Sequence, residues 1–214
     1  MMILTYELGS KLYINLTNRC SNSCDFCLRT AKANDLTFED WKTDRDLGGV
    51  ESQLWLDREP TVGEVIESLK GRNLADYEEV VFCGFGEPTE RMDECIEIAK
   101  WLKAKNVKVR LNTNGQANLI QGCDVTPKMK GLFDVVSISL NNKNAVEYQQ
   151  VCHSEFGEKA FGALLEFGKK CSQLGIETVF SVVDLLPKED IEKCRELAEE
   201  NGGTLRVREY IEQG

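Results

Sequence analysis

The sequence predicts an α/β protein of one domain, built on parallel strands. Short β-rich runs alternate with helical patterns, which is typical of βαβ units. The length of 214 residues fits about one domain, and we expect residues 1–214 to form it. The composition is 42% hydrophobic and 29% charged, with 17 Gly and 4 Pro. These values exclude disordered, collagen-like and coiled-coil chains.

Six β-rich runs predict the strands, and they lie at 11–17, 79–83, 107–111, 135–140, 178–183 and 205–210. Periodicity alone leaves open whether these strands form a doubly wound sheet or an incomplete barrel. In both folds, ligands bind beyond the carboxyl ends of the strands. The segments that directly follow the strands are therefore the candidate functional segments.

Helical patterns separate most of these runs. Thr61 and Glu64 form a capping box at the start of the first pattern, and Pro88 suits the first turn of the second. Gly175 is the expected left-handed residue at the end of the third. The predicted helices are 61–69, 88–102, 161–174 and 189–200.

Charge and hydropathy exclude several classes of partner. The net charge of −10 argues against nucleic acid and anionic lipid. The apolar runs are far shorter than the roughly 20 residues of a membrane helix, and the N-terminus lacks the features of a signal peptide. We expect a cytoplasmic protein with no membrane partner. The chain has nine cysteines, and clustered thiols in a reducing compartment indicate metal binding or catalysis.

Three of these cysteines, Cys20, Cys24 and Cys27, follow the first β-rich run within eight residues. A structural zinc site takes four protein ligands, and the only histidine, His153, lies far along the chain. An iron–sulfur cubane held by three thiolates would keep one iron open to an external ligand. This spacing favours a cluster over a zinc site completed by a distant residue or three unliganded cysteines.

The segment after the second run contains Gly84 and Gly86, with Phe85 between them, followed by Glu87. It fails the dinucleotide-binding fingerprint, because Thr89 stands at the third glycine position. Two glycines let backbone approach a ligand, and a carboxylate at the opening of a helix can bind an ammonium group. The alternative is a plain turn with a solvated glutamate.

Together, three segments resemble the radical S-adenosylmethionine (SAM) superfamily. They are the CxxxCxxC loop after the first run, Gly-Glu-Pro at 86–88 after the second, and Thr-Asn-Gly at 113–115 after the third. The resemblance covers essentially the whole chain. Residues 12–20 and 54–60 look more narrowly like the small TatD-associated radical SAM proteins.

The resemblance implies a single-domain partial (β/α)6 barrel. Cys20, Cys24 and Cys27 would hold a [4Fe–4S] cluster whose open iron takes SAM. Phe26 is expected near the adenine, and Gly86, Glu87 and Pro88 near the methionyl amine. The full set of residues expected to contact SAM is Phe26, Gly84, Gly86, Glu87, Pro88, Asn114, Ser139, Asn141 and Val207.

The implied activity is reductive cleavage of SAM to a 5′-deoxyadenosyl radical, which abstracts hydrogen from a small-molecule substrate. An electron donor such as flavodoxin or ferredoxin is implied as a partner. The alternatives are an activating enzyme that acts on a partner protein, a nucleic-acid-modifying enzyme and a non-enzymatic metal or redox module. Residues 30–60 form a long segment after the cysteines, and we expect it to act as a lid. We expect Arg29 and Leu54-Trp55-Leu56 to border the cofactor cavity, with a second subunit or a partner protein completing it.

The remaining candidates allow two interpretations each. Arg206, Arg208 and Tyr210 alternate along the last run, and this face either holds an anion or is a solvated edge. Cys83 is either structural or part of the site. The other residues are expected to be structural or uninformative: Cys95, Cys171 and Cys194 in the core, Cys123 and Cys152 in loops, and His153 at the surface.

Overall fold

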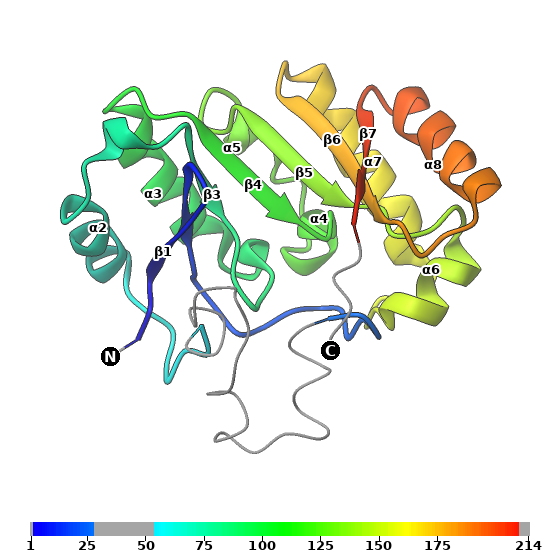
Figure 1. The fold of residues 1–214 in the computed structure, drawn as a ribbon, viewed down its shortest axis with the longest axis horizontal. Coiled ribbons are helices and arrows are strands. Elements are labelled where there is room, and N and C mark those ends of the chain that lie inside the picture. Colours follow the sequence, from blue (N-terminus) through cyan, green and yellow to red (C-terminus); the bar gives the residue numbers. More distant parts are fainter. Residues whose placement is uncertain (1, 28–53, 210–214) are drawn as a thin grey trace.

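The computed structural model describes residues 2–27 and 54–209. They form one sheet of seven strands that lie side by side in chain order (Figure 1). The first two strands are antiparallel, and every later neighbour is parallel. The strands are β1 (Thr5–Leu8), β2 (Lys11–Ile14), β3 (Glu79–Phe82), β4 (Val109–Thr113), β5 (Val135–Ser139), β6 (Glu177–Val183) and β7 (Thr204–Arg208).

The helices connect consecutive parallel strands and lie along the outer side of the curved sheet (Figure 1). The α-helices are α2 (Val62–Lys70), α3 (Met92–Lys103), α4 (Ala117–Ile120), α5 (Thr126–Met129), α6 (Ala145–Cys152), α7 (Lys159–Gln173) and α8 (Lys188–Glu200). Two 3₁₀ turns, η3 (Leu74–Asp76) and η4 (Pro88–Arg91), precede β3 and α3. The fold is therefore an α/β partial barrel of six parallel strands with one added antiparallel strand.

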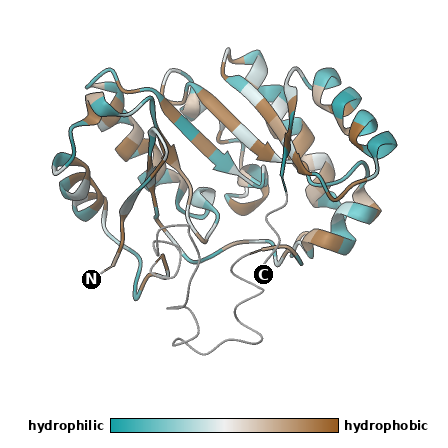
Figure 2. Ribbon diagram, in the orientation of Figure 1, coloured by the Kyte–Doolittle hydropathy of each residue, from teal (hydrophilic) through white to brown (hydrophobic). Residues whose placement is uncertain are grey.

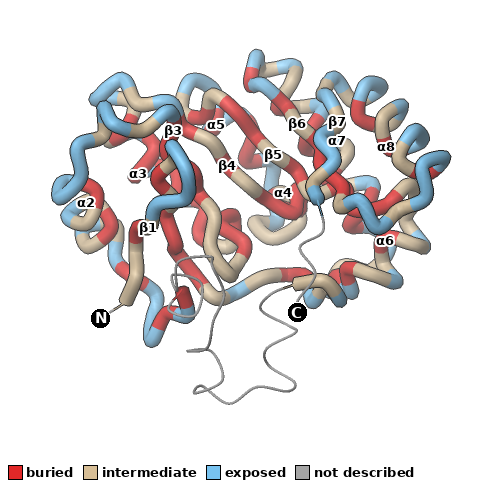
Figure 3. Tube along the Cα trace, in the orientation of Figure 1, coloured by how far each residue is buried: buried red, intermediate tan, exposed pale blue. Residues whose placement is uncertain are grey.

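The hydrophobic core lies between the sheet and the helices. Each strand sends alternate residues to this side, such as Ile14, Phe82 and Val182, which have no exposed surface. Figure 2 shows apolar residues along the strands, and Figure 3 shows that the central strands are largely buried, whereas the edge strands β1 and β7 are not. The other face of the sheet is the concave inner face of the half-barrel, and its side chains are mostly polar.

The structure confirms the predicted fold class and all six parallel strands. The capping box is present, since the Thr61 hydroxyl accepts from the Glu64 amide and the Glu64 carboxylate accepts from the Thr61 amide. Gly175 has a φ of +82° just after α7, as predicted. β1 and helices α4, α5 and α6 were not predicted, and Pro88 begins a 3₁₀ turn instead of the α-helix itself.

Across residues 2–27 and 54–209, no helix has the length and apolar character needed to cross a membrane.

Candidate functional site

The loop after β2 carries the three predicted cluster cysteines across the carboxyl edge of the sheet. Figure 1 shows it running from β2 to the neighbourhood of α6. Three backbone hydrogen bonds fasten it there: Ser23 N donates to Cys152 O at 3.0 Å, Asp25 N donates to Val151 O at 3.0 Å, and Glu155 N donates to Ser21 O at 2.9 Å. The His153 ring nitrogen Nε2 lies 2.7 Å from Asp25 Oδ1 at the surface.

The donor set on this loop fits an iron–sulfur cluster. Cys20, Cys24 and Cys27 are half-buried and are not in disulfides, and thiolates are the usual protein ligands of such clusters. The Cys27 amide donates to Cys24 O at 3.0 Å, which makes a turn between these two. Within the described ranges, no three His, Cys, Asp or Glu side chains are grouped closely enough to hold a metal ion. Binding therefore requires the sulfur atoms to turn toward one another.

Cys24 has a neighbour that the sequence did not reveal. Cys152, assigned to a loop in the sequence analysis, is the last residue of α6 and is fully buried. Its sulfur hydrogen-bonds to Cys24 and accepts from Asn141 Nδ2 at 3.3 Å. The bond to Cys152 and burial together raise the pKa of Cys24. Because a thiolate is the form that binds metal, a cluster bound at Cys24 has to overcome this raised pKa.

A buried hydrogen-bond network centred on Gln116 supports the cysteine loop. Gln116 Oε1 accepts from the Ser21 hydroxyl at 3.0 Å and the Ser154 hydroxyl at 2.9 Å. Gln116 Nε2 donates to Asn22 Oδ1 at 2.8 Å and to the Tyr148 hydroxyl at 2.9 Å. Because buried polar groups are costly to leave unpaired, this network fixes the loop between Cys20 and Cys24.

The two predicted glycines pack against protein. A Cβ at Gly86 would lie 2.3 Å from Thr17 O and 2.5 Å from Arg19 O, and one at Gly84 would lie 2.1 Å from Asn15 Oδ1. Gly86 N also donates to Thr17 O at 3.0 Å. Packing within the protein therefore requires glycine at both positions, and the predicted approach to a ligand stays a prediction. The two glycines let the segment after β3 pack directly on the backbone that leads to Cys20.

Glu87 is buried, and protein donors occupy most of its carboxylate. Oε1 accepts from the Thr89 amide at 3.1 Å, the Thr89 hydroxyl at 2.7 Å and the Thr113 hydroxyl at 2.7 Å. Oε2 accepts from the Asn114 amide at 2.6 Å. Burial raises the pKa of Glu87, although these hydrogen bonds oppose the shift. This is not the solvated glutamate of a plain turn, and at most one acceptor position remains for an ammonium group.

Two asparagines at the carboxyl ends of β4 and β5 face the same region. Asn114 Nδ2 donates to the Ser21 hydroxyl at 2.9 Å, so it joins β4 to the cysteine loop. Asn141 has a φ of +57°, and its Oδ1 is buried without a partner among the described residues. An orphaned buried acceptor is costly. It fits a site that a ligand with hydrogen-bond donors, such as SAM, would complete.

The remaining predicted residues differ in placement. Ser139 lies at the end of β5, and Phe26 packs partly against the core. Pro88 is buried and accepts from the Cys95 thiol at 3.2 Å. Val207 pairs with the buried Val182 on the helix side of the sheet. Its side chain therefore points away from the inner face, and only its backbone could make the predicted contact with adenine.

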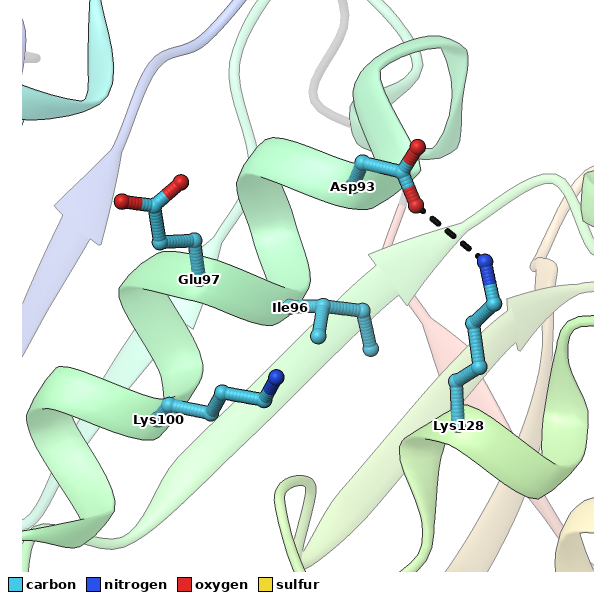
Figure 4. Close-up of a pocket in the computed structure, with 5 residues that line it drawn as sticks. All are labelled: Asp93, Ile96, Glu97, Lys100 and Lys128. Atoms are coloured by element: carbon cyan, nitrogen blue, oxygen red, sulfur yellow. Dashed lines mark hydrogen bonds and ion pairs between the residues drawn. The ribbon is translucent and has the colours of Figure 1, made fainter.

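Two surface pockets in the described residues lie in the helix layer and contain none of the predicted site residues. The larger, of about 560 Å³, lies between α3 and α5, where Lys128 and Asp93 form an ion pair at 3.3 Å (Figure 4). The smaller, of about 310 Å³, lies next to η3. The larger is lined mostly by charged residues, and the smaller by polar and apolar residues in equal number. Neither pocket contains a residue of the cysteine loop.

Several solved structures share this fold. SuiB from Streptococcus suis bound to S-adenosylmethionine has a TM-score of 0.67 and 15% identity, over 95% of this chain and 41% of that one. SuiB bound to the precursor peptide SuiA has a TM-score of 0.68 and 16% identity, over 97% and 40%. A radical SAM methyltransferase from Sphaerobacter thermophilus has a TM-score of 0.61 and 15% identity, over 95% and 57%.

The chain therefore spans about two fifths of SuiB and somewhat more than half of the methyltransferase. At these identities the likeness concerns the fold. No relative among curated protein sequences matches the chain. The model of the Radical SAM superfamily matches residues 14–200. That range includes the cysteine loop, both glycines and the ends of β4 and β5. The chain belongs to the Radical SAM superfamily, and this membership supports an enzyme over a non-enzymatic metal or redox module.

Proposed function

We propose that the protein is a radical SAM enzyme that acts on a small molecule, with the [4Fe–4S] cluster held by Cys20, Cys24 and Cys27. The observation that carries this proposal is the position of three reduced cysteines on one loop at the carboxyl edge of six parallel strands. When bound and reduced, the cluster supplies the electron that cleaves SAM to a 5′-deoxyadenosyl radical, which abstracts hydrogen from substrate. A small electron-transfer protein such as flavodoxin or ferredoxin would reduce it.

The chain's own part is to hold the reactants in place. Gly86 and the Gln116 network support the cysteine loop from two sides. Asn141 Oδ1 is the acceptor we assign to the ribose of SAM, with Ser139 beside it. We assign the methionyl amine to the 86–88 segment, where Glu87 acts mainly through its negative charge. Asn114 and Phe26 complete the proposed contacts.

We further propose that residues 30–60 cover the site. Residues 30–53 and Arg29 lie outside the described residues, so the argument rests on the end of the segment. Asn18 and Leu56 exchange two hydrogen bonds, at 2.7 and 3.1 Å, and Asn15 Nδ2 donates to Leu54 O at 2.6 Å. These bonds attach the segment to the chain that leads to Cys20. Trp55 is 54% exposed, and its ring centroid lies 6.1 Å from that of Phe85.

The narrower assignment, to the small TatD-associated radical SAM proteins, rests on residues 12–20 and 54–60. Asn15 and Asn18 in the first stretch bind the backbone of the second. The two stretches that carry the resemblance therefore form one local structure beside the cysteine loop.

Anaerobic reconstitution of the full chain tests the proposal. Wild type should take up about four irons per chain and form 5′-deoxyadenosine when reduced with SAM. Cys24→Ala should lose both properties. Cys123→Ala, which removes an exposed cysteine outside the loop, should keep both. Tightly bound zinc without iron uptake, or equal iron in both variants, would contradict the cluster assignment.

A further inference from the structure

The inner face of the half-barrel has an unusual charge distribution for an acidic chain. On β7, Leu205 packs with the core and Val207 lies on the same side, so Arg206 and Arg208 alternate with them and face inward. The side chains that share this inner face, by strand register, are Lys11, Tyr13, Glu79, Val81, Arg110, Asn112, Val135, Ser137, Ser139, Glu177, Val179, Ser181, Val183, Thr204, Arg206 and Arg208.

Charges on distant strands influence one another across the inner face. Cys83 at the end of β3 and Cys24 in the cysteine loop act electrostatically on the pKa of Arg208, and Arg206 acts on that of Tyr13 on β2, without direct contact. In a flat sheet, β3 and β7 would be about 19 Å apart, at roughly 4.8 Å per strand step. The curvature therefore brings Arg208 over the interior, on the side of the proposed cluster.

One group of charges on this face is already balanced. Glu79 accepts from Lys11 Nζ at 2.5 Å and from Arg110 Nε at 2.8 Å. In residues 2–27 and 54–209, no carboxylate lies within ion-pair distance of Arg206 or Arg208. The Nε of Arg208 is buried, and no described residue accepts its hydrogen bond.

An unpaired, partly buried guanidinium is costly, because a charge loses hydration on burial and needs a partner to compensate. Burial lowers the pKa of Arg208, but arginine stays protonated in proteins. On the same inner face, Asn112 Oδ1 is also buried, with no partner among the described residues. Among the described residues of the inner face, Arg208 is thus a cation without a hydrogen-bond acceptor at Nε, and Asn112 Oδ1 is an amide acceptor without a donor. Glu79 Oε2 is also buried without a hydrogen bond, but Lys108 Nζ lies 4.0 Å from it.

We propose that Arg208, with Arg206 beside it, forms a subsite for an anionic group, a carboxylate or a phosphate, on the substrate. The guanidinium geometry matches both groups in a two-point contact, and Asn112 Oδ1 would accept from an O–H or N–H of the same molecule. This inference rests on the proposed function, which places the substrate in the same interior. It narrows the substrate class to small anions that carry a hydrogen-bond donor.

The same chemistry has a second source, the carboxylate of SAM, so the experiment needs two arms. In the first, inorganic phosphate is titrated calorimetrically at low salt into the cluster-free full chain. Arg208→Gln should lower phosphate affinity at least tenfold, and Arg206→Gln about threefold. Arg195→Gln, which removes an arginine paired with Glu192 on α8, should leave the affinity unchanged. In the second arm, SAM is titrated into the reconstituted protein, and Arg208→Gln should stay within twofold of wild type.

The following results would contradict the proposed anion subsite. Absence of phosphate binding by wild type, or equal affinity in wild type and Arg208→Gln, would overturn the anion subsite. A tenfold loss of SAM affinity in Arg208→Gln would assign the subsite to the cofactor and overturn the substrate assignment. If Arg208→Gln does not fold, Arg206→Gln and Arg208→Lys are measured instead. A phosphate affinity equal to wild type in both variants overturns the subsite. Because the first arm uses no cluster, its outcome is independent of whether the cluster assignment fails.

Discussion

The Glu87→Gln substitution tests whether the buried carboxylate holds the ends of β3 and β4 together. A glutamine can keep its amide oxygen where Oε1 accepts three hydrogen bonds. Its NH₂ group then takes the place of Oε2 and faces the Asn114 amide, which lies 2.6 Å from Oε2 in the native protein. Two donors meet there, so the Asn114 N–H loses its partner.

The size of this effect follows from the lost bond. A hydrogen bond to a charged group contributes about 1.5–3 kcal/mol, and leaving a buried N–H unpaired costs about 1–3 kcal/mol. We expect the free energy of unfolding to fall by about 3 kcal/mol, which for a chain of this size lowers the melting temperature by about 6–12 °C. Urea unfolding at about pH 8, well above the ordinary glutamate pKa, measures it directly.

Glu97→Gln on the exposed face of α3 is the matched control, because the same chemical change in water should alter stability by less than about 0.5 kcal/mol. A Glu87→Gln protein as stable as this control would refute the reasoning. It would show that the Asn114 N–H does not depend on Glu87 Oε2 as its acceptor in the folded protein.

Three further predictions concern the rest of the inner face and the loop. Burial opposes ionisation of Glu79, but hydrogen bonds from Arg110 and Lys11 hold its pKa below the usual range. The stability that this carboxylate contributes is therefore present above the ordinary glutamate pKa and is lost as pH falls through the lowered value. As pH is lowered, the free energy of unfolding should fall less steeply in Glu79→Gln than in wild type. Gly86→Ala should destabilise the protein by more than about 2 kcal/mol, because its Cβ would overlap Thr17 O. The control Gly162→Ala, in open space on α7, should stabilise the protein by up to about 1 kcal/mol. Equal thermal stability in the two variants would contradict the packing role of Gly86. Because we propose that the 30–60 segment shields the site, Trp55→Ala should raise the amount of 5′-deoxyadenosine formed per molecule of product. An unchanged ratio would show that this end of the segment only packs against the protein.

The fold was predictable where hydrophobic pattern and topology agree. The parallel strands β2 to β6 contain apolar residues buried against helices, and such runs carry a strong local signal. β7 has no buried residue, but its apolar Leu205 and Val207 alternate with arginines. β1 was missed because its four residues, Thr5–Leu8, include only one that is buried. Gly9, with a φ of +60°, sits in the tight turn that joins β1 to β2, and it was the one available signal. α6 was missed for a related reason, since only two of its eight residues are buried.

The site was predictable only in its local motifs. The three cysteines are close in sequence, so their spacing makes them candidate cluster ligands, and this assignment stays a prediction. Cys152 and Gln116 were missed because their contacts to Cys24 and Ser21 join residues far apart in the chain, and spacing does not encode such contacts. The sequence does not reveal which backbone passes beside Gly86. It therefore could not predict that packing within the protein requires a glycine there.

The position of β7 has a consequence for solubility. Among residues 2–27 and 54–209 it is the last strand of the sheet, with β6 on one side and no described strand on the other, and exposed edge strands invite pairing with other chains. Inward-pointing charges are one of the means by which proteins block such pairing, and Arg206 and Arg208 are charges of this kind. Neutralising both should therefore make the purified protein more prone to aggregate through this edge, even when its thermal stability is unchanged.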